Sequence, residues 1–213
     1  MIITVGHTKG GVGKSTLALN IAIERSRVGS NTLIIDGDAK QASISKAIGI
    51  RVDAGQLPAL SCTILEDANT LRHQIGRLKS QYQDIVIDVG GYDSNSLRAA
   101  LTVSDALLLP VAPESIEVWA IDDMLSLVRE ARRIQDFRVL AVLNRGKSVG
   151  QDNSDTIKVI REYTDIDLLP GTIGSRSVFG NAFGRGQSVA EYKPSNPKAR
   201  LELAGLMQSI YAD

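Results

Sequence analysis

Three glycines and two lysines lie close together near the start of the chain, in the run Lys-Gly-Gly-Val-Gly-Lys-Ser-Thr at residues 9–16. The apolar residues Ile2–Val5 precede this run and a helix-like apolar pattern follows from Leu17, so the run joins a strand to a helix. Glycines let backbone N–H groups turn toward an anion, and the start of a helix adds its positive dipole end. Lys14 would contact the outer phosphates of a nucleotide, and the Ser15 hydroxyl would ligate magnesium. The alternative is a glycine-rich hairpin with two solvated lysines, but the flanking pattern favours a nucleoside triphosphate site.

Aspartates end two apolar runs later in the chain. Ile34-Ile35 is followed by Asp36 and Asp38, and residues 85–87 are followed by Asp88. In an open parallel sheet, ligands bind beyond the carboxyl ends of the strands, where such carboxylates can support a magnesium ion, usually through water. Strand-end aspartates also cap helices and turns. Because both runs occur in a chain with a phosphate loop, the pattern favours a role in metal binding.

Short apolar runs alternate with helix-length segments along the chain. Runs of this kind are typical of a parallel sheet that is covered by helices on both sides. The expected strands are Ile2–Val5, Thr32–Ile35, Ala59–Ile64, Ile85–Val89, Ala106–Val111 and Val139–Leu143. The expected helices are Ser15–Val28, Glu66–Ser80, Ile116–Arg133, Ser154–Tyr163 and Pro197–Tyr211. The pattern therefore predicts an α/β fold with a doubly wound, mostly parallel sheet and helices on both faces.

One of the expected helices carries an apolar stripe. Apolar side chains recur there at helical spacing, which is typical of a buried core or a subunit contact. They are Ile116, Trp119, Ala120, Met124, Leu127, Val128 and Ala131. Turn-forming residues elsewhere predict irregular structure in the stretches Val149–Asp155 and Gly171–Gly186.

The composition limits the class of protein. The chain has 213 residues, 43% of them hydrophobic, which suffices for one buried α/β core, and we expect a single domain over residues 1–213. Lysine and arginine total 24 and so do aspartate and glutamate, which excludes a globally basic nucleic-acid binder but not a local basic patch. The single Cys62 rules out an internal disulfide and a cysteine-built metal or iron–sulfur site. The sequence shows no signal-like leader and no apolar stretch of about 18 residues, so we expect a cytoplasmic protein.

Residues 9–16, 36–41 and 85–91 together resemble the ParA/MinD family of deviant-Walker P-loop ATPases. Within that family the chain looks most like the small plasmid-partition ParA proteins, and the likeness extends over nearly its whole length. The run from Lys9 matches the deviant Walker A loop residue by residue. The generic Walker pattern has a glycine where this chain has Thr8, and it does not ask for a lysine at the next position.

Two segments depart from the family pattern. Ala39-Lys40-Gln41 stands where the family has Pro-Gln, so the register after Asp38 differs. Val89-Gly90-Gly91 replaces the common x-Pro-Pro after the second aspartate run. Because glycine is less restricted than proline, the second departure predicts a more flexible switch loop.

The resemblance implies that ATP and Mg²⁺ are the cofactors and that a homodimer encloses the bound ATP. Lys9 would reach across to the partner's phosphates, because a cation supplied in trans can neutralise charge on the transferring phosphoryl group. The family's other roles fall on matching positions, although an asparagine at a strand end is also an ordinary turn residue. The phosphates would be held by Lys14 with Gly10, Gly11, Val12 and Gly13, and the α-phosphate region by Thr16. Ser15 would ligate the magnesium, and Asp36 and Asp88 would support it. Asp38 would orient the attacking water, and Asn144 would read adenine.

A switch ATPase needs an output, and DNA binding without sequence preference is the first candidate. Between Gly171 and Arg200 the basic residues are opposed by Glu191 alone, and the patch would be doubled in a dimer. A solvated basic surface is the alternative for each residue taken singly. The candidates are Arg176, Arg185, Lys198 and Arg200, with Lys193 nearby. The resemblance further implies a ParB-like or other cargo adaptor protein, and nucleoid association in the ATP state.

Other outputs remain open on the sequence alone. A MinD-like switch at a membrane surface would use a basic amphipathic C-terminal helix, but no basic residue follows Arg200, so we expect no membrane binding. A positioning ATPase for a protein cargo would share the same site chemistry. A metabolic enzyme on this fold is the least expected, since redox relatives need paired cysteines and only Cys62 is present.

Overall fold

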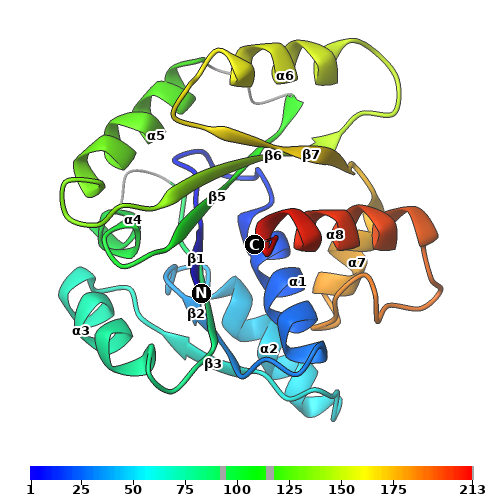
Figure 1. Ribbon diagram of the computed structural model, residues 1–213. Coiled ribbons are helices and arrows are strands. Elements are labelled where there is room, and N and C mark those ends of the chain that lie inside the picture. Colours follow the sequence, from blue (N-terminus) through cyan, green and yellow to red (C-terminus); the bar gives the residue numbers. More distant parts are fainter. Residues whose placement is uncertain (92–94, 114–117, 213) are drawn as a thin grey trace.

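The computed structural model describes residues 1–91, 95–113 and 118–212, and a seven-stranded sheet runs through them (Figure 1). Neighbouring strands are parallel throughout, in the order β3-β2-β4-β1-β5-β6-β7. The strands are β1 (Ile2–Val5), β2 (Thr32–Asp36), β3 (Ser61–Ile64), β4 (Asp84–Asp88), β5 (Ala106–Val111), β6 (Arg138–Gly146) and β7 (Asp167–Gly174). The prediction of a doubly wound parallel sheet is confirmed.

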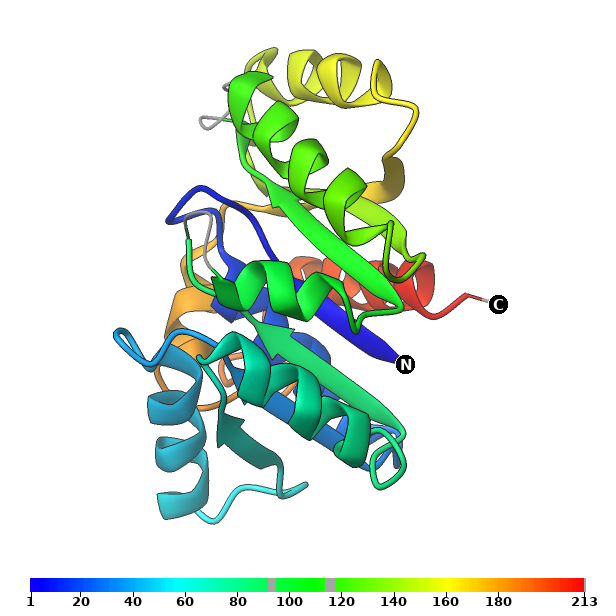
Figure 2. The ribbon, with the colours of Figure 1, turned by 90° about the vertical axis from the view of Figure 1, so that its left-hand side faces the viewer.

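Helices cover both faces of this sheet, and each face has its own apolar core. One layer contains α1 (Lys14–Arg27), α2 (Ser43–Asp53), α7 (Ser177–Phe183) and α8 (Pro197–Ile210). The other contains α3 (Ala68–Leu78), α4 (Asn95–Leu101), α5 (Val118–Ala131) and α6 (Asp152–Arg161). Figure 2 looks onto this second layer, with α3, α4 and α5 in front of the strands.

The central strands are apolar because both of their faces are covered. Successive side chains of a strand point to opposite faces, and in β1 the side chains of Ile3 and Val5 join the α1 core, whereas Ile2 packs against the α5 core. Every residue of β2, β4 and β5 is buried. This double burial explains why the runs lack the polar alternation of a half-exposed strand.

The apolar stripe of α5 belongs to the core. Met124, Leu127, Val128 and Ala131 are buried in the cluster that this helix shares with α3, α4 and α6. The core interpretation of the stripe is therefore confirmed for these residues. Ile116 lies outside the described residues, as does the side chain of Trp119.

The prediction of irregular structure in two stretches is wrong for most of their length. Gly171–Gly186 contains the end of β7 and the whole of α7, and α6 begins at Asp152, inside the expected loop. β7 is an edge strand that contains Pro170 and Gly171, residues that are depleted in strands and tolerated at a sheet edge. Because such residues are tolerated at an edge, the sequence gives only a weak strand signal for β7.

Besides α7, the helices α2 and α4 were not expected. α2 has the sequence SISKAIGIRVD, whose glycine and β-branched residues have low helix propensity. Its Ile44, Ala47 and Ile48 nevertheless lie at helical spacing and are buried, so tertiary packing overrides the local preference. α4 spans only residues 95–101, which is too short for a clear period.

The carboxyl ends of the strands meet at one end of the sheet. In Figure 2 the loop between β1 and α1 lies at that end, on the left, whereas the N-terminus lies at the opposite end. In the register of the sheet, Val5 pairs with Asp88, and Asp36 also pairs with Asp88. The glycine loop and both aspartate runs are thus brought to one edge, as the sequence predicted. Within the described residues, no helix is both long enough and apolar enough to cross a membrane.

Candidate nucleotide site

The glycine loop between β1 and α1 is shaped to receive an anion. Gly11 and Gly13 have φ angles of 77° and 94°, in the left-handed region that side chains disfavour. A Cβ atom built on Gly10 or Gly11 would meet nothing within 4 Å, so open space lies against the loop backbone. α1 begins at Lys14, and no described side chain caps its start. The first N–H groups of the helix are therefore available for phosphate oxygens.

Lys14 lies under this loop and is only 7% exposed. Its Nζ donates a hydrogen bond to the Lys9 carbonyl over 2.8 Å. Burial lowers the pKa of Lys14, and the Asp88 and Asp38 carboxylates partly oppose that shift. The ammonium is thus held close to the loop, where a phosphate would compensate its burial.

Asp88 ends β4 beneath Lys14 and is almost fully buried. The Ser15 hydroxyl hydrogen-bonds its carboxyl group, and among the described residues its Oδ1 has no hydrogen-bond partner. Burial raises the pKa of Asp88 to about 7, with Asp36 and Asp38 adding to the shift and Ser15 and Lys14 opposing it. A buried carboxylate oxygen without a partner, next to a hydroxyl, fits a magnesium ion that takes most of its other ligands from phosphate and water.

Asp36 lies on the neighbouring strand, but its oxygens are engaged by its own loop. Its Oδ2 accepts from Ser45 N at 2.9 Å and Ser45 Oγ at 3.0 Å, and its Oδ1 accepts from Asp38 N at 3.2 Å. Asp36 therefore organises the chain between β2 and α2. A part in the outer magnesium shell stays a prediction. Among the described residues, no group of three or more His, Cys, Asp or Glu side chains could hold a metal by itself.

Asp38 and two glycines close the phosphate site on the side of β4. They line a cavity of about 330 Å³ together with the glycine loop and Gln41. A Cβ on Gly90 would lie 3.0 Å from Asp38 Oδ2, and one on Gly91 would lie 3.1 Å from Gly10 N. The two glycines that replace the family's prolines therefore let this loop approach both Asp38 and the glycine loop. That these glycines give a flexible switch loop stays a prediction.

A second cavity, of about 350 Å³, lies on the other side of the glycine loop. The loop itself, the end of β6 and the start of α7 line it, and Thr16 and Asn144 are among its walls. Asn144 Nδ2 donates to the Val12 carbonyl over 2.7 Å, and a Cβ on Gly13 would lie 2.3 Å from the same nitrogen. The residue predicted to read adenine is therefore in direct contact with the phosphate loop.

Sequence reasoning missed two residues that hold this loop. Arg145 Nη1 donates to the Gly11 carbonyl over 2.7 Å, and its φ of 58° is unusual for a residue with a side chain. His7 Nδ1 accepts from the Lys9 N–H at 2.9 Å. Because the Arg145 contact joins residues 134 positions apart, no local pattern indicates it. His7 lies next to the motif, in a position where the motif specifies nothing.

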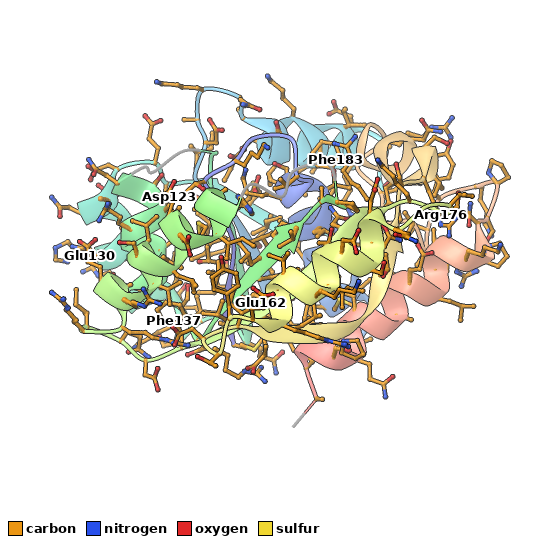
Figure 3. All side chains as sticks on the ribbon, turned by 90° about the horizontal axis from the view of Figure 1, so that it is seen from above. Asp123, Glu130, Phe137, Glu162, Arg176 and Phe183 are labelled. Atoms are coloured by element: carbon orange, nitrogen blue, oxygen red, sulfur yellow. The ribbon has the colours of Figure 1, made fainter. Side chains whose placement is uncertain are left out.

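The predicted DNA-contacting residues divide into two groups. Arg185, Lys198 and Arg200 are exposed, and the Arg185 guanidinium lies 5.0 Å from the centre of the Tyr192 ring. Arg176 is half-buried in the wall of the second cavity and pairs with Glu202, with Nη2 and Oε1 2.6 Å apart. Figure 3 shows Arg176 between α7 and α8, on the opposite side of the molecule from Asp123 of α5.

The charges around this basic segment differ from the expectation that Glu191 alone opposes it. Glu191 accepts from both Nη atoms of the buried Arg51, each over 2.9 Å. Glu202, two residues beyond the segment, neutralises Arg176 instead. The basic segment therefore has one cation, Arg176, that an acidic side chain already neutralises.

Comparison with known proteins supplies the family. Residues 1–130, which hold the glycine loop and both aspartate runs, match the family model described as ATPase MipZ. The chain belongs to this MipZ family. It is thus an ATPase of the ParA/MinD type, as the sequence predicted, with ATP as its nucleotide and Mg²⁺ as its metal.

The similarity to known relatives extends over nearly the full length of the chain. The chain is 21% identical to the maintenance of carboxysome distribution protein A of Halothiobacillus neapolitanus, over 98% of this chain and 95% of the relative. Its fold is similar to that of a putative plasmid partition protein of Borrelia burgdorferi B31 bound to AMPPNP (TM-score 0.78, 20% identity, covering 98% and 97% of the two chains).

A third relative has been solved with nucleotide and metal. The septum site-determining protein MinD of Pyrococcus horikoshii OT3, complexed with Mg-ADP, gives a TM-score of 0.77 at 22% identity, covering 99% of this chain and 96% of that one. Taken together, these relatives and the family model class the MipZ-family chain as a segregation or positioning ATPase.

Proposed function

We propose that the protein is a dimerising switch ATPase, acting as one unit over residues 1–213, that holds DNA without sequence preference in its ATP state and so positions a cargo. One observation carries the dimer. Of the two loop lysines, Lys14 lines the phosphate cavity, whereas Lys9 is not among the described residues that line it. We infer that Lys14 serves the protomer's own phosphates and that Lys9 reaches those of a second protomer.

Within one protomer, each group has a separate task. When bound, Mg²⁺ neutralises charge on the phosphates of ATP. Ser15 and Asp88 would hold the metal, and the glycine-loop N–H groups with Lys14 would hold the phosphates. Asp38, at the wall of the same cavity, would orient the attacking water. Gly91 allows the loop that follows β4 to contact Gly10. A structural change at the phosphates on hydrolysis would therefore be transmitted to that loop.

The DNA surface is proposed on the exposed residues Arg185, Lys198 and Arg200, supported by their charge and their position near α7 and α8. Contacts to phosphates would give binding that is salt-dependent and independent of sequence. Arg176 stays a candidate, but its pairing with Glu202 means that it must exchange partners to bind DNA. A cargo adaptor protein would stimulate turnover.

Binding to random-sequence duplex DNA tests the proposal, measured with ATP, with ADP and without nucleotide across a salt series. ATP-dependent binding that weakens steeply with salt would support the switch. The double variant Lys198→Glu/Arg200→Glu should weaken binding to every sequence alike and leave ATP hydrolysis unchanged. An ATP-dependent dimer without DNA affinity would overturn the DNA output and favour a protein cargo.

A further inference from the structure

The peptide on each side of Lys9 is held by a different side chain. On the amino side, the Lys9 N–H donates to His7 Nδ1 over 2.9 Å. On the carboxyl side, the Lys9 carbonyl accepts from Lys14 Nζ over 2.8 Å. The direction in which the Lys9 side chain leaves the loop is set by these two peptide planes. His7 and Lys14 together therefore fix the orientation of Lys9.

His7 is itself fixed to the sheet. It is 2% exposed and follows Gly6, whose N–H donates to the Leu108 carbonyl of β5 over 3.1 Å. A Cβ on Gly6 would lie 3.0 Å from Leu97 Cδ1 and 3.2 Å from Leu107 Cδ1, so the chain passes tightly against β5 and α4 just before the histidine. His7 is thus attached to a rigid element, as a side chain that positions another residue must be.

The two bonds to Lys9 respond differently to nucleotide. Lys14 is the proposed phosphate ligand, so its three N–H donors would have to serve both the Lys9 carbonyl and the phosphates. The bond from Lys9 N–H to His7 involves no phosphate-binding group. In the ATP state, the bond to His7 would then hold the Lys9 peptide without competition from phosphate.

We propose that His7 is a positioning residue of this ATPase, which orients the Lys9 side chain toward the phosphates of the second protomer by accepting the Lys9 N–H. The inference deepens the proposed function and rests on its dimer. A neutral acceptor suits the position, since a carboxylate there would pair with the two lysines and withdraw them from the phosphates.

The charge state of His7 agrees with this role. Burial, and then the positive charges of Lys14 and Lys9, lower the pKa of His7 to about 4. The imidazole is therefore neutral in the working range of the enzyme, and Nδ1 keeps the lone pair that accepts the Lys9 N–H.

Two amide variants separate the role in positioning from a role in packing. His7→Asn places its carbonyl oxygen near the position of Nδ1, whereas His7→Gln moves the same amide one methylene further out. We expect H7Q to lower kcat about tenfold, as for a buried donor left without its acceptor, and H7N to keep kcat within about threefold. The affinity for Mg-ADP should change less than threefold in both, because the Gly11–Lys14 N–H groups stay in place.

His73, exposed on α3, provides the control, and H73N should behave as the unchanged protein. Equal losses in H7N and H7Q, or a kcat for H7Q within twofold of the unchanged protein, would overturn the inference. A fall in Mg-ADP affinity that matches the fall in kcat would also overturn it, because that pattern belongs to a general loss of loop structure. Should H7Q fail to fold, His7→Ala must show the same selective loss of kcat.

The proposed function fails separately. If Lys9→Ala hydrolyses ATP at the unchanged rate, no lysine acts in trans, whatever the His7 variants do. If Lys9→Ala is inactive and H7N and H7Q do not differ, the dimer stands and the role of His7 is wrong.

Discussion

The buried Asp88 carboxyl makes the stability of the nucleotide-free protein depend on pH. Burial raises the pKa of Asp88 to about 7 in the folded state, from 3.8 in the unfolded chain. Above pH 4 the folded protein therefore keeps a proton that the unfolded chain loses. The contribution of Asp88 to the free energy of unfolding is fully present below pH 4, is lost progressively as the pH rises to 7, and changes little above that. Magnesium, which needs the ionised carboxylate, should bind more tightly over the same range.

Replacing Asp88 by Asn tests this account. At pH 8 and without nucleotide, Asp88→Asn should raise the melting temperature by at least about 3 °C, since about 1 kcal/mol shifts Tm by roughly 2–4 °C in a chain of this size. At pH 5.5 the folded protein keeps the proton but the unfolded chain has already lost it, so the gain should be about half of that at pH 8. Calorimetry at both pH values is the measurement, and a stabilisation that is equal at both would contradict the electrostatic cause. Mg²⁺-dependent hydrolysis should fall in this variant.

Arg145 combines an unfavourable backbone angle with a hydrogen bond to the glycine loop. A φ of 58° is energetically unfavourable for a residue with a Cβ atom, whereas glycine adopts it readily. Arg145→Gly should therefore leave Tm unchanged or raise it, although it removes the donor to the Gly11 carbonyl. The loss of that donor should raise the KM for ATP about three- to tenfold.

Arg145→Ala is the matched variant, because it removes the guanidinium and keeps the unfavourable angle. It should show the same KM as Arg145→Gly with a lower Tm. An unchanged KM in both variants would show that the contact with Gly11 does not support the loop.

At the scale of elements, the loop after β4 meets the loop after β1 at two glycines. A methyl group on Gly91 would lie 3.1 Å from Gly10 N and 3.2 Å from Gly10 Cα, closer than ordinary packing allows. Gly91→Ala should therefore push the two loops apart and weaken ATP binding about tenfold, measured by titration with a fluorescent ATP analogue. Gly76→Ala in the last turn of α3 is the control, since a Cβ on Gly76 would meet nothing within 4 Å and alanine favours a helix. Equal affinities in the two variants would rule out the contact.

α2 is tied to the segment before α8 by a buried ion pair. Arg51 is 1% exposed and donates to Glu191 and to the Pro58 and Gly186 carbonyls. Arg51→Ala leaves this carboxylate and these carbonyls without their donor, so the free energy of unfolding in urea should fall by about 3–5 kcal/mol. Arg27→Ala, which removes a surface pair with Glu24, should cost no more than about 1 kcal/mol. A similar small loss in both would mean that water replaces the buried partners.

The elements that the sequence predicted are those whose signal is local. β1 and β5 have the predicted bounds, because continuous apolar runs between turn residues identify buried strands. α2, α7 and β7 were missed, because glycine or proline weakens their local signal and distant contacts supply their stability. Gly186 illustrates such a contact, since a Cβ there would lie 2.4 Å from the Ala47 carbonyl of α2.

The residues of the site divide in the same way into those that a local pattern predicts and those that it does not. The glycine loop, Ser15 and the two aspartate runs were predicted because each lies within a short segment that has a chemical pattern. Arg145 and Glu202 were missed because their partners are distant in sequence. Only the folded chain brings these residues to the loop and to Arg176.

At the scale of the whole molecule, the proposed dimer joins the glycine-loop ends of two sheets. Lys9→Ala should abolish the ATP-dependent dimer in light scattering and reduce hydrolysis at least about a hundredfold, as expected for loss of a cation supplied in trans. Nucleotide affinity of the monomer should persist, since Lys14 and the glycine N–H groups remain. A Lys9→Ala protein that still dimerises with ATP would show that the sandwich does not depend on this lysine.

The strand order also determines what is exposed while the protein is being synthesised. β5, with six buried residues, pairs on one side with β1 and on the other with β6, and β6 is reached only after α5. The N-terminal part leaves the ribosome first, so one edge of β5 stays unpaired until β6 has been synthesised. The Val12 carbonyl likewise lacks its bond from the Asn144 amide until then. A nascent chain that has emerged from the ribosome only as far as α5 would therefore expose the unpaired edge of β5 and be prone to aggregate.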